Sequence, residues 1–459
     1  MSRLRAWWRG RPSLRDEVAV VALAALARGA AVLWAFRRIP PVDDGTYYQI
    51  FAERLARGLG YTWAWPDGAV TYAAHYPVGY PAWLSLLYRV FGSAPEVGMF
   101  GNALVGTLGV WAVYRLALSA GRRGPAALCG VIAALHPSLV AYTPALMTEA
   151  FTSAGLVLLA WLAQSTRRTT GAGKWFGWLG LGLGGGALVL IRPQVVFLLP
   201  LLGALAVARS GARRLAAASA VLLIGVLSCL PWTLRNCERL DRCVFVSANG
   251  GWNLFIGAAP GATGAWVSLE QLGVPEECRD VFAEAEKDVC FGRAGLRYVV
   301  EEPLRFASLI PTKLSQTFDF SFAPGHYLRT ANSAALSFQA MVGLGVAEAL
   351  LQRLVLLIAF FGVASASGPN PRVRQGLGLL GAGWLFLRAA WISHVLLLLA
   401  AGLLGRRLWQ RPNTVFGVAV IAATGLTHAA FFGAGRYGLV CVLPLIPLLA
   451  DAFAPRTED

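Results

Sequence analysis

Charged residues are scarce in this sequence of 459 residues, where Asp, Glu, Lys and Arg together account for 14% and hydrophobic residues for 56%. A typical soluble domain has about 25% charged residues. This composition, with a mean hydropathy of +0.57, excludes an ordinary soluble domain and indicates a protein that crosses the membrane repeatedly. The net charge of +16 does not indicate nucleic-acid binding, because the basic residues form short clusters between apolar runs.

Signals of several other protein classes are missing as well. No small-residue cleavage site follows the first apolar run, residues 18–36, so we expect this run to stay as a helix. No GK[ST] ends the glycine-rich run "NGGWNLFIGAAPGATG", which is therefore not a P-loop. Its glycines could let the backbone approach a phosphate or a sugar, or could simply form turns.

Long apolar runs, in contrast, are abundant. A helix needs roughly 20 apolar residues to cross the bilayer, and shorter runs suffice where neighbours bury them, so we expect an all-α polytopic protein with about twelve spans. The two short runs 377–387 and 392–404 could instead form one helix, which would place the C-terminus on the opposite side of the membrane. The predicted spans are residues 18–36, 97–118, 125–139, 145–162, 175–191, 195–207, 215–230, a run ending near 366, 377–387, 392–404, 415–432 and 437–453.

The basic clusters orient these spans. With a cytoplasmic N-terminus, the internal segments hold eighteen Lys and Arg and two acids, as the positive-inside rule requires. Only the two outer loops then have enough polar chain for a site, so we expect an extracytoplasmic site on a multi-pass protein of a bacterial inner (plasma) membrane. The predicted divisions are 1–17 (cytoplasmic), 18–36 (first span), 37–96 (outer catalytic loop), 97–230 (spans two to seven), 231–345 (long outer loop), 346–453 (spans eight to twelve) and 454–459 (cytoplasmic).

Four of the seven cysteines lie in the long outer loop: Cys237, Cys243, Cys278 and Cys290. An even set on the oxidising face suggests two disulfides, and the nearest of the three possible pairings joins Cys237 to Cys243 and Cys278 to Cys290. Metal ligation is the rival interpretation. The cysteines lack a CxxC spacing and no His lies between residues 235 and 305, so we favour disulfides.

Three acids fall at the outer ends of predicted spans. Asp43 and Asp44 follow a Pro-Pro break just after the first span, and Glu149 opens the fourth. An ionisable group near the membrane is a candidate for function. Acids at helix starts also serve as caps and dipole partners, so both interpretations stay open on these residues alone.

Two arginines are expected at the same level as these acids. Arg192 lies in a tight outer turn and Arg436 precedes the last span, each in an apolar setting. Both need an anionic partner there. An internal salt bridge to one of the acids would supply it, and so would a bound phosphate, whose oxygens Arg matches bidentately.

In combination these motifs resemble the GT-C membrane glycosyltransferases, in particular the superfamily of protein O-mannosyltransferases and lipid A aminoarabinose transferases (ArnT-like). The resemblance covers most of the chain in the family's order. Three motifs depart from the usual pattern: the family's P-P-G-Y-P is "YPVGY", its "GN" is Gly257-Ala258, and its common Asp-Glu is Asp-Asp. The matching pieces are "DDGTYYQIFAERLARGLGY", "HYPVGYPAWLSLLYRVFG" (also typical of a helix along the membrane surface), "MTEAF", "IRPQ", "PWTLRN", "NGGWNLFIGAAPGATG" and "HAAFFGAGRYGLVCVLPLIPLLA".

The resemblance implies a GT-C fold and transfer of a sugar from a polyprenyl-phosphate carrier to a lipid, glycan or protein acceptor, on the outer side of the membrane. It implies membrane lipids and no nucleic acid as partners. Asp43 takes the position of the family's catalytic acid and would deprotonate the acceptor hydroxyl, with inversion at the sugar carbon.

The remaining candidates have supporting roles in that reaction. Arg192 and Arg436, with Lys313 as a further candidate, would stabilise the phosphate leaving group, and a divalent metal such as Mg or Mn could share that role. The other candidate positions support the acids or line the site. They are Asp44, Glu149 and His75, which could position the base, acceptor or metal, and Tyr47, Tyr437, Asn249 and Asn253 as lining residues.

A secondary transporter is the main alternative, because about twelve spans with charges near the membrane also describe many carriers. Transporters usually place acids near the midplane within repeated halves. Here the acids gather outside and no internal repeat is evident. A non-catalytic lipid-binding scaffold is a third possibility, which would require the acids to be dispensable.

Overall fold

The computed structural model describes Trp8, Gly10 and residues 13–208, 211–319, 321–387 and 389–453. This part of the chain is a helical bundle, and its sheet is a hairpin of two antiparallel strands, β1 (Thr62–Ala64) and β2 (Val70–Tyr72). The predicted all-α polytopic class is confirmed. The hairpin is an addition that the sequence did not predict, since strands of three residues leave almost no periodicity to detect.

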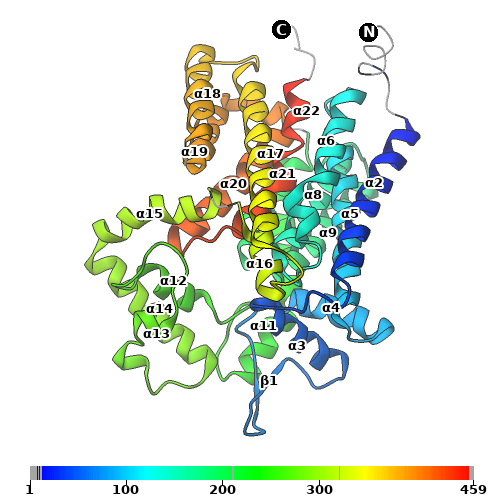
Figure 1. The fold of residues 1–459 in the computed structure, drawn as a ribbon. Helices are drawn as coiled ribbons and strands as arrows, with labels where there is room; N and C mark the ends of the chain where they lie inside the picture. The colour runs from blue at the N-terminus through cyan, green and yellow to red at the C-terminus, as the bar shows by residue number, and fades with distance from the viewer. Residues whose placement is uncertain are drawn as a thin grey trace.

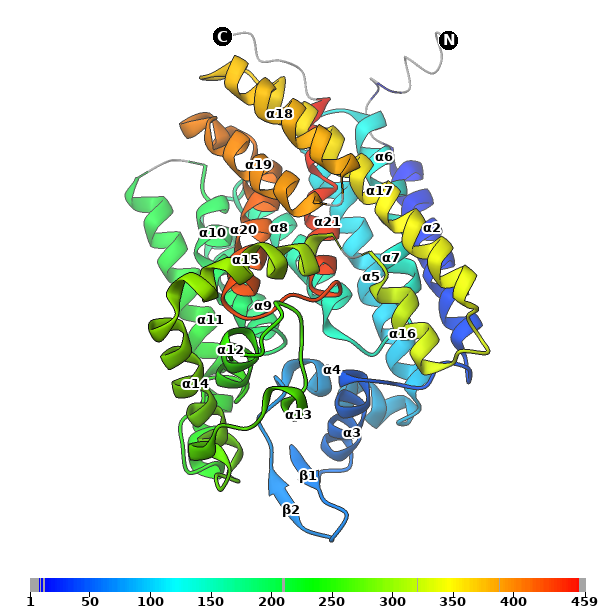
Figure 2. The ribbon, with the colours of Figure 1, turned by 60° about the vertical axis from the view of Figure 1, so that its left-hand side comes forward.

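Most helices belong to the bundle drawn in Figures 1 and 2. Its large core is rich in Ala, Val and Leu, the residues that pack best without polar atoms. The bundle elements are α2 (Leu14–Ala35), α5 (Pro95–Leu118), α6 (Arg123–Leu135), α7 (Pro137–Ala141), α8 (Thr148–Thr166), α9 (Ala172–Val189), η1 (Pro193–Leu198), α10 (Leu199–Leu205), α11 (Ala212–Arg239), α17 (Phe338–Ala364), α18 (Pro371–Phe386), α19 (Ala390–Gly402), η3 (Gly405–Gln410), α20 (Pro412–Ala430), η4 (Tyr437–Cys441), α21 (Val442–Leu445) and α22 (Leu448–Ala452).

Within the described residues, six helices are long and apolar enough to cross a membrane. The other predicted spans coincide with helices that fall short of that length or hydropathy, so the count of twelve stays a prediction. Runs 377–387 and 392–404 form two separate helices, α18 and α19, which pack against each other. The six segments are Leu14–Ala35, Pro95–Leu118, Arg123–Ala141, Ala212–Arg239, Phe338–Ala364 and Pro412–Ala430.

The two predicted outer loops meet at one end of the bundle, opposite the start of α2 and the end of α22 (Figure 1). A second, smaller core centred on Phe255 and Phe291 holds the later loop together. Helix α4 forms where "HYPVGYPAWLSLLYRVFG" predicts a helix. The outer elements are α3 (Asp44–Ala56), α4 (Gly79–Phe91), α12 (Gly250–Ala258), α13 (Leu269–Leu272), η2 (Glu276–Cys278), α14 (Glu284–Glu301), α15 (Pro303–Phe318) and α16 (Ala323–Ala331).

Helix α11 differs from the predicted boundary at residue 230, because it continues through Pro231 to Arg239. The side chains beyond the proline are anchored to the extended segment that follows. Trp232 Nε1 donates to the carbonyl of Val246 at 2.8 Å, and Asn236 Nδ2 donates to that of Val244 at 3.1 Å. These bonds offset the backbone hydrogen bond that a proline removes from a helix.

One glycine ties the first outer loop to the bundle. Gly79, in the "YPVGY" motif, donates its N–H to the carbonyl of Leu190 at 2.7 Å. A Cβ on Gly79 would lie 2.6 Å from the carbonyl carbon of Leu190, too close for any side chain. The glycine therefore fixes the first loop against the turn that carries Arg192.

Candidate active site

Asp43 precedes α3 in a strained conformation. Its φ of 50° and ψ of −135° are uncommon for a residue other than glycine, and such backbone costs about 1–3 kcal/mol. Its side chain is exposed and makes no cap hydrogen bond. Among the described residues the geometry therefore gives no support to the capping interpretation of Asp43, and strain of this kind gathers at functional sites.

Asp44 is bound on both carboxylate oxygens. Its Oδ2 lies 2.7 Å from Nη2 of Arg436, and its Oδ1 accepts a hydrogen bond from the Tyr76 hydroxyl at 3.1 Å. Arg436 belongs to the loop between α20 and η4, so this ion pair joins the first outer loop to the far end of the chain. Asp44 thus serves as the ion-pair partner of Arg436, whereas Asp43 has no charged partner among the described residues.

Glu149 connects the two arginines. Its Oε1 lies 2.5 Å from Nη2 of Arg192 and 3.6 Å from Nε of Arg436. Arg192 Nε also donates to the Thr148 hydroxyl at 3.0 Å. The Glu149 side chain is 1% exposed, and its Oε2 has no partner in the described part of the chain.

Together these four side chains, Asp44, Glu149, Arg192 and Arg436, form what we call the ion cluster. Two acids balance two arginines, so the arginines do pair internally, as one of the two predicted interpretations requires. Each guanidinium has five N–H donors, and the contacts above use only some of them. The Arg436 side chain is 27% exposed, so an oxygen-rich anion can still reach it.

Aromatic rings form the wall beside the ion cluster. The guanidinium carbons of Arg192 and Arg436 lie 5.5 and 5.3 Å from the ring centre of Tyr437. Tyr437 stacks on His428 with a centroid distance of 4.1 Å. Tyr47 stacks on Tyr76 at 5.3 Å. Both predicted tyrosines therefore lie at the site and contact it through their rings.

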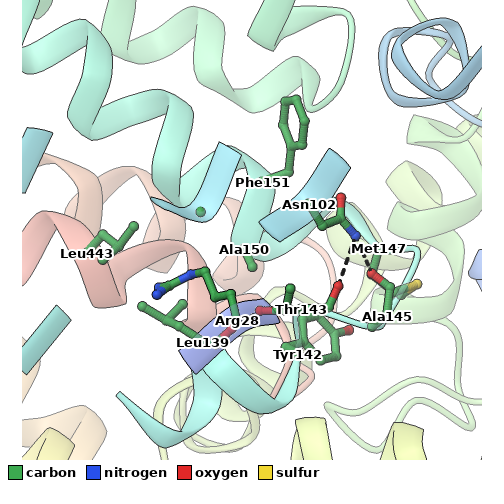
Figure 3. Close-up of a pocket in the computed structure, with 11 residues that line it drawn as sticks. Arg28, Asn102, Leu139, Tyr142, Thr143, Ala145, Met147, Ala150, Phe151 and Leu443 are labelled. Carbon is green, nitrogen blue, oxygen red and sulfur yellow. Dashed lines mark hydrogen bonds between the residues drawn. The ribbon is translucent and has the colours of Figure 1, made fainter. Parts of the chain in front are cut away.

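Asn102 of α5 holds the segment that leads into Glu149. Its Nδ2 donates to the carbonyls of Thr143 and Ala145 at 3.3 and 2.8 Å, as Figure 3 shows. Its Oδ1 accepts from the Tyr80 hydroxyl at 3.0 Å. Because Tyr80 follows Gly79, the "YPVGY" motif supports the start of α8 as well as the turn at Arg192.

Tyr327 of α16 contacts the backbone just before the acid pair. Its hydroxyl accepts the backbone N–H of Val42 at 3.3 Å. A Cβ on Gly45 would lie 2.8 Å from that hydroxyl, so the glycine after the two acids makes room for it. Sequence reasoning missed Tyr327, Asn102 and Thr148, and no local pattern marks them, because their contacts join distant segments.

Lys313 is not brought to the ion cluster. Its Nζ donates to the carbonyls of Ala429 and Ala430 at 3.2 and 3.4 Å and lies 4.0 Å from the ring centre of Phe306. Burial lowers the pKa of Lys313 to about 8. Lys313 thus binds the last carbonyls of α20, just before the loop that carries Arg436.

His75, Asn249 and Asn253 line the neighbouring surface at α12. The His75 ring meets Tyr76 at 5.0 Å and Trp252 at 5.4 Å, centre to centre. Burial lowers the pKa of His75, which favours its neutral form. Asn249 accepts from the Ser247 hydroxyl at 3.0 Å, and no hydrogen bond of the Asn253 side chain is found among the described residues.

The outer cysteines form two disulfides, Cys237–Cys243 and Cys278–Cys290. This is the nearest pairing of the three possible. The residues that the structure describes contain no group of three or more His, Cys, Asp or Glu placed to hold a metal ion. The divalent metal that the sequence left open therefore stays a prediction.

Comparison with known proteins gives a family match over part of the chain. Residues 75–234 match the family described as dolichyl-phosphate-mannose-protein mannosyltransferase, and no curated protein matches the sequence. One similar structure is the Archaeoglobus fulgidus oligosaccharyltransferase tethered with an acceptor peptide, with 15% identity, 95% of this chain covered and a TM-score of 0.44. This chain spans about half of that protein, 49% of its length.

Another similar structure is ArnT from Cupriavidus metallidurans bound to undecaprenyl phosphate. It shows 15% identity, covers 95% of this chain and 77% of its own, and gives a TM-score of 0.40. The family match includes Glu149, Arg192 and the "YPVGY" motif. That match is limited to residues 75–234, and within them it agrees with the glycosyltransferase family that the motifs of this chain resemble.

Proposed function

We propose that this protein transfers a sugar from a polyprenyl-phosphate carrier to a hydroxyl acceptor, with Asp43 as the base. The observation that carries the proposal is the contrast within the acid pair. Asp44 is bound by Arg436 and Tyr76, whereas Asp43 is exposed and held at a φ of 50°. The matched family takes its description from a dolichyl-phosphate sugar donor, which supports a polyprenyl-phosphate donor for this chain.

The reaction follows from the chemistry of that donor. The acceptor oxygen attacks the anomeric carbon while its proton passes to the Asp43 carboxylate. The bond from that carbon to the phosphate oxygen breaks, and its electron pair leaves on the phosphate. Attack opposite the leaving group inverts the configuration of the sugar carbon.

The leaving phosphate needs charge stabilisation more than it needs a proton. Arg436 and Arg192 can supply it through the N–H groups that their acid partners leave free, and such preorganised donors stabilise developing charge effectively. Glu149 and Asp44 hold the two guanidinium groups in place. Lys313 contributes at most at longer range, because backbone carbonyls hold its ammonium group.

The outer side of the membrane is the proposed location of this chemistry. Nucleotide sugars are scarce outside the cytoplasm, so a donor carried by a membrane lipid suits a site at the bilayer surface. Helix α3, whose first residue is Asp44, lies at the end of the bundle that holds the outer loops (Figure 2). The acceptor class and a contribution from a divalent cation remain predictions, which acceptor panels and chelation can test.

The test follows the release of polyprenyl phosphate by mass spectrometry. Purified protein in nanodiscs receives a panel of polyprenyl-phosphate sugars and an envelope extract as the source of acceptor. We expect wild type to release the free carrier and Asp43→Asn to be slower by a factor on the order of 10²–10⁴, the usual contribution of a general base. Asp67→Asn, an exposed acid in the turn of the hairpin, is the matched control and should retain full activity.

Two results would refute the proposal. Equal rates for wild type and Asp43→Asn would show that Asp43 is not the base. If no donor released its carrier and donor-free vesicles took up solute, the protein would be a transporter and not a transferase.

A further inference from the structure

A second group of buried polar side chains, none of them part of the ion cluster, lies between α7, α17 and α19. Glu348 is 2% exposed, and its carboxylate has only a weak hydrogen-bonding contact, with the side chain of Ser138, in the described structure. His136 is 1% exposed, and its ring has only a weak hydrogen-bonding contact, with the side chain of Gln352. Burying polar groups without partners is costly, and most costly for a charge.

These side chains face one another across a single cavity. Glu348 and Gln352 are four residues apart and lie on the same face of α17. Ser138 lies beside Glu348, and Gln352 lies beside His136. The four residues line a cavity with a volume of about 50 Å³ accessible to water, whose walls also include His394.

Glu348 has no basic partner to balance its charge. It takes part in none of the salt bridges formed by the described residues. It also lies ten residues into α17, which places it about 15 Å along the helix axis, deep in a candidate membrane span. An ionisable side chain at that depth is a functional-site candidate, and it needs a positive charge nearby.

The geometry points to a binding site for one small monovalent cation, such as Na⁺, in this cavity. One carboxylate balances one positive charge, whereas a divalent ion would leave an excess charge buried. The oxygens of Glu348, Gln352 and Ser138 are the hard ligands that such a cation prefers, and a His136 nitrogen or water completes the set. The volume admits an ion and a few waters and is too small for a sugar.

The cavity also explains why an ion here would stabilise the protein. Its walls come from α7, α15, α16, α17 and α19 and from Gly435 and Gly438, which flank Arg436 and Tyr437. An ion held between these elements links the last part of the chain to the middle of the bundle. Binding to the folded state alone raises stability with ion concentration.

The test measures sodium binding and thermal unfolding in nanodiscs, in NaCl and in choline chloride at equal ionic strength. We expect wild type to bind radioactive sodium saturably, one ion per chain, and to unfold at a higher temperature in NaCl. Glu348→Gln should bind sodium about tenfold more weakly or worse, which corresponds to about 1.4 kcal/mol. The sodium-dependent rise in its unfolding temperature should disappear.

The controls keep the inference open to refutation. Glu270→Gln removes an exposed acid on α13 and should bind sodium as wild type does. If Glu348→Gln fails to fold, wild type alone decides, because the absence of saturable sodium binding overturns the proposal. Equal sodium binding by wild type and Glu348→Gln, or equal stability in the two salts, would mean that the cavity holds only water or a proton. None of these readouts depends on transferase activity.

Discussion

At the scale of residues, Arg192 and Arg436 share one carboxylate of Glu149, and an experiment can separate the role of Arg192 from its pairing with this acid. A double-mutant cycle on Arg192 and Glu149 isolates the interaction between these two side chains. We expect Arg192→Gln to raise the KM for the lipid donor about ten- to hundredfold even when Glu149 is already Gln, because a lost charge-assisted hydrogen bond to phosphate is worth about 1.5–3 kcal/mol. The measurement is the donor KM of the four proteins in the cycle.

The opposite outcome has a clear meaning. If Arg192→Gln leaves the KM unchanged in the Glu149→Gln background, the arginine serves only as the partner of the acid. The effect would then be on stability, since breaking a buried pair costs about 3–5 kcal/mol when one charge is left behind.

Tyr327 provides the next prediction, as a positioning residue for the turn at Asp43. Tyr327→Phe removes the hydroxyl that accepts the Val42 N–H, so the strained turn loses one anchor. We expect kcat to fall about two- to tenfold with the donor KM nearly unchanged, in line with about 0.5–1.5 kcal/mol for one hydrogen bond. Tyr298→Phe, on α14 and away from the acids, is the control. A fall in unfolding temperature with kcat intact would assign Tyr327 to structure alone.

The sequence predicted the candidate site well where charge in an apolar setting was the signal. Asp44, Glu149, Arg192 and Arg436 were expected at one level, and the structure brings them into contact. Lys313 was a further candidate for stabilising the phosphate, and its ammonium group lies instead on the carbonyls of α20. Tyr327 could not be found, because its contact with Val42 spans 285 residues and depends on tertiary packing.

At the scale of elements, the outer disulfide Cys278–Cys290 closes a short loop onto α14 beside the small core at Phe255 and Phe291. Replacing both cysteines by Ser should destabilise this unit by about 3 kcal/mol, the loop-entropy value for about 15 residues. The bundle has its own core and should be unaffected. Hydrogen exchange of residues 250–301 should rise while exchange in α5 and α8 stays the same.

Reduction provides the control for the disulfide prediction. A reductant should reproduce the effect in wild type and add nothing at this site in the double variant. Equal protection of α14 in both proteins would show that the small core is sufficient without the disulfide.

The elements themselves were predictable where hydrophobic length was the signal. The ends of four helices agree with the predicted apolar runs to within about one turn: both ends of α2, α5 and α20, and the C-terminal end of α17. For α17 only that end was predicted. The hairpin, the two-helix form of residues 371–402 and the continuation of α11 were not determined by composition. Each depends on tertiary contacts, such as the bond of Trp232 to Val246, which override local preference.

At the scale of the whole molecule, the structure places the hairpin and the turn between α17 and α18 at opposite ends of the bundle (Figure 1). Because basic residues favour the cytoplasmic side, and Arg372 and Arg374 follow that turn, we expect the turn inside and the hairpin outside. Single cysteines at Asp67 and Asn370, both exposed, can report this through a thiol reagent that does not cross membranes. Intact cells should label Asp67→Cys and not Asn370→Cys.

The native thiols give this experiment a low background, because the free cysteines Cys129, Cys229 and Cys441 are buried and the other four are paired. Asn370→Cys should become reactive only when the membrane is permeabilised. Labelling of Asn370→Cys in intact cells would place the turn outside, so that α17 no longer runs from the outer loop to the cytoplasm. The count of spans and the outer location of the ion cluster would then both have to be revised, since both depend on this single orientation.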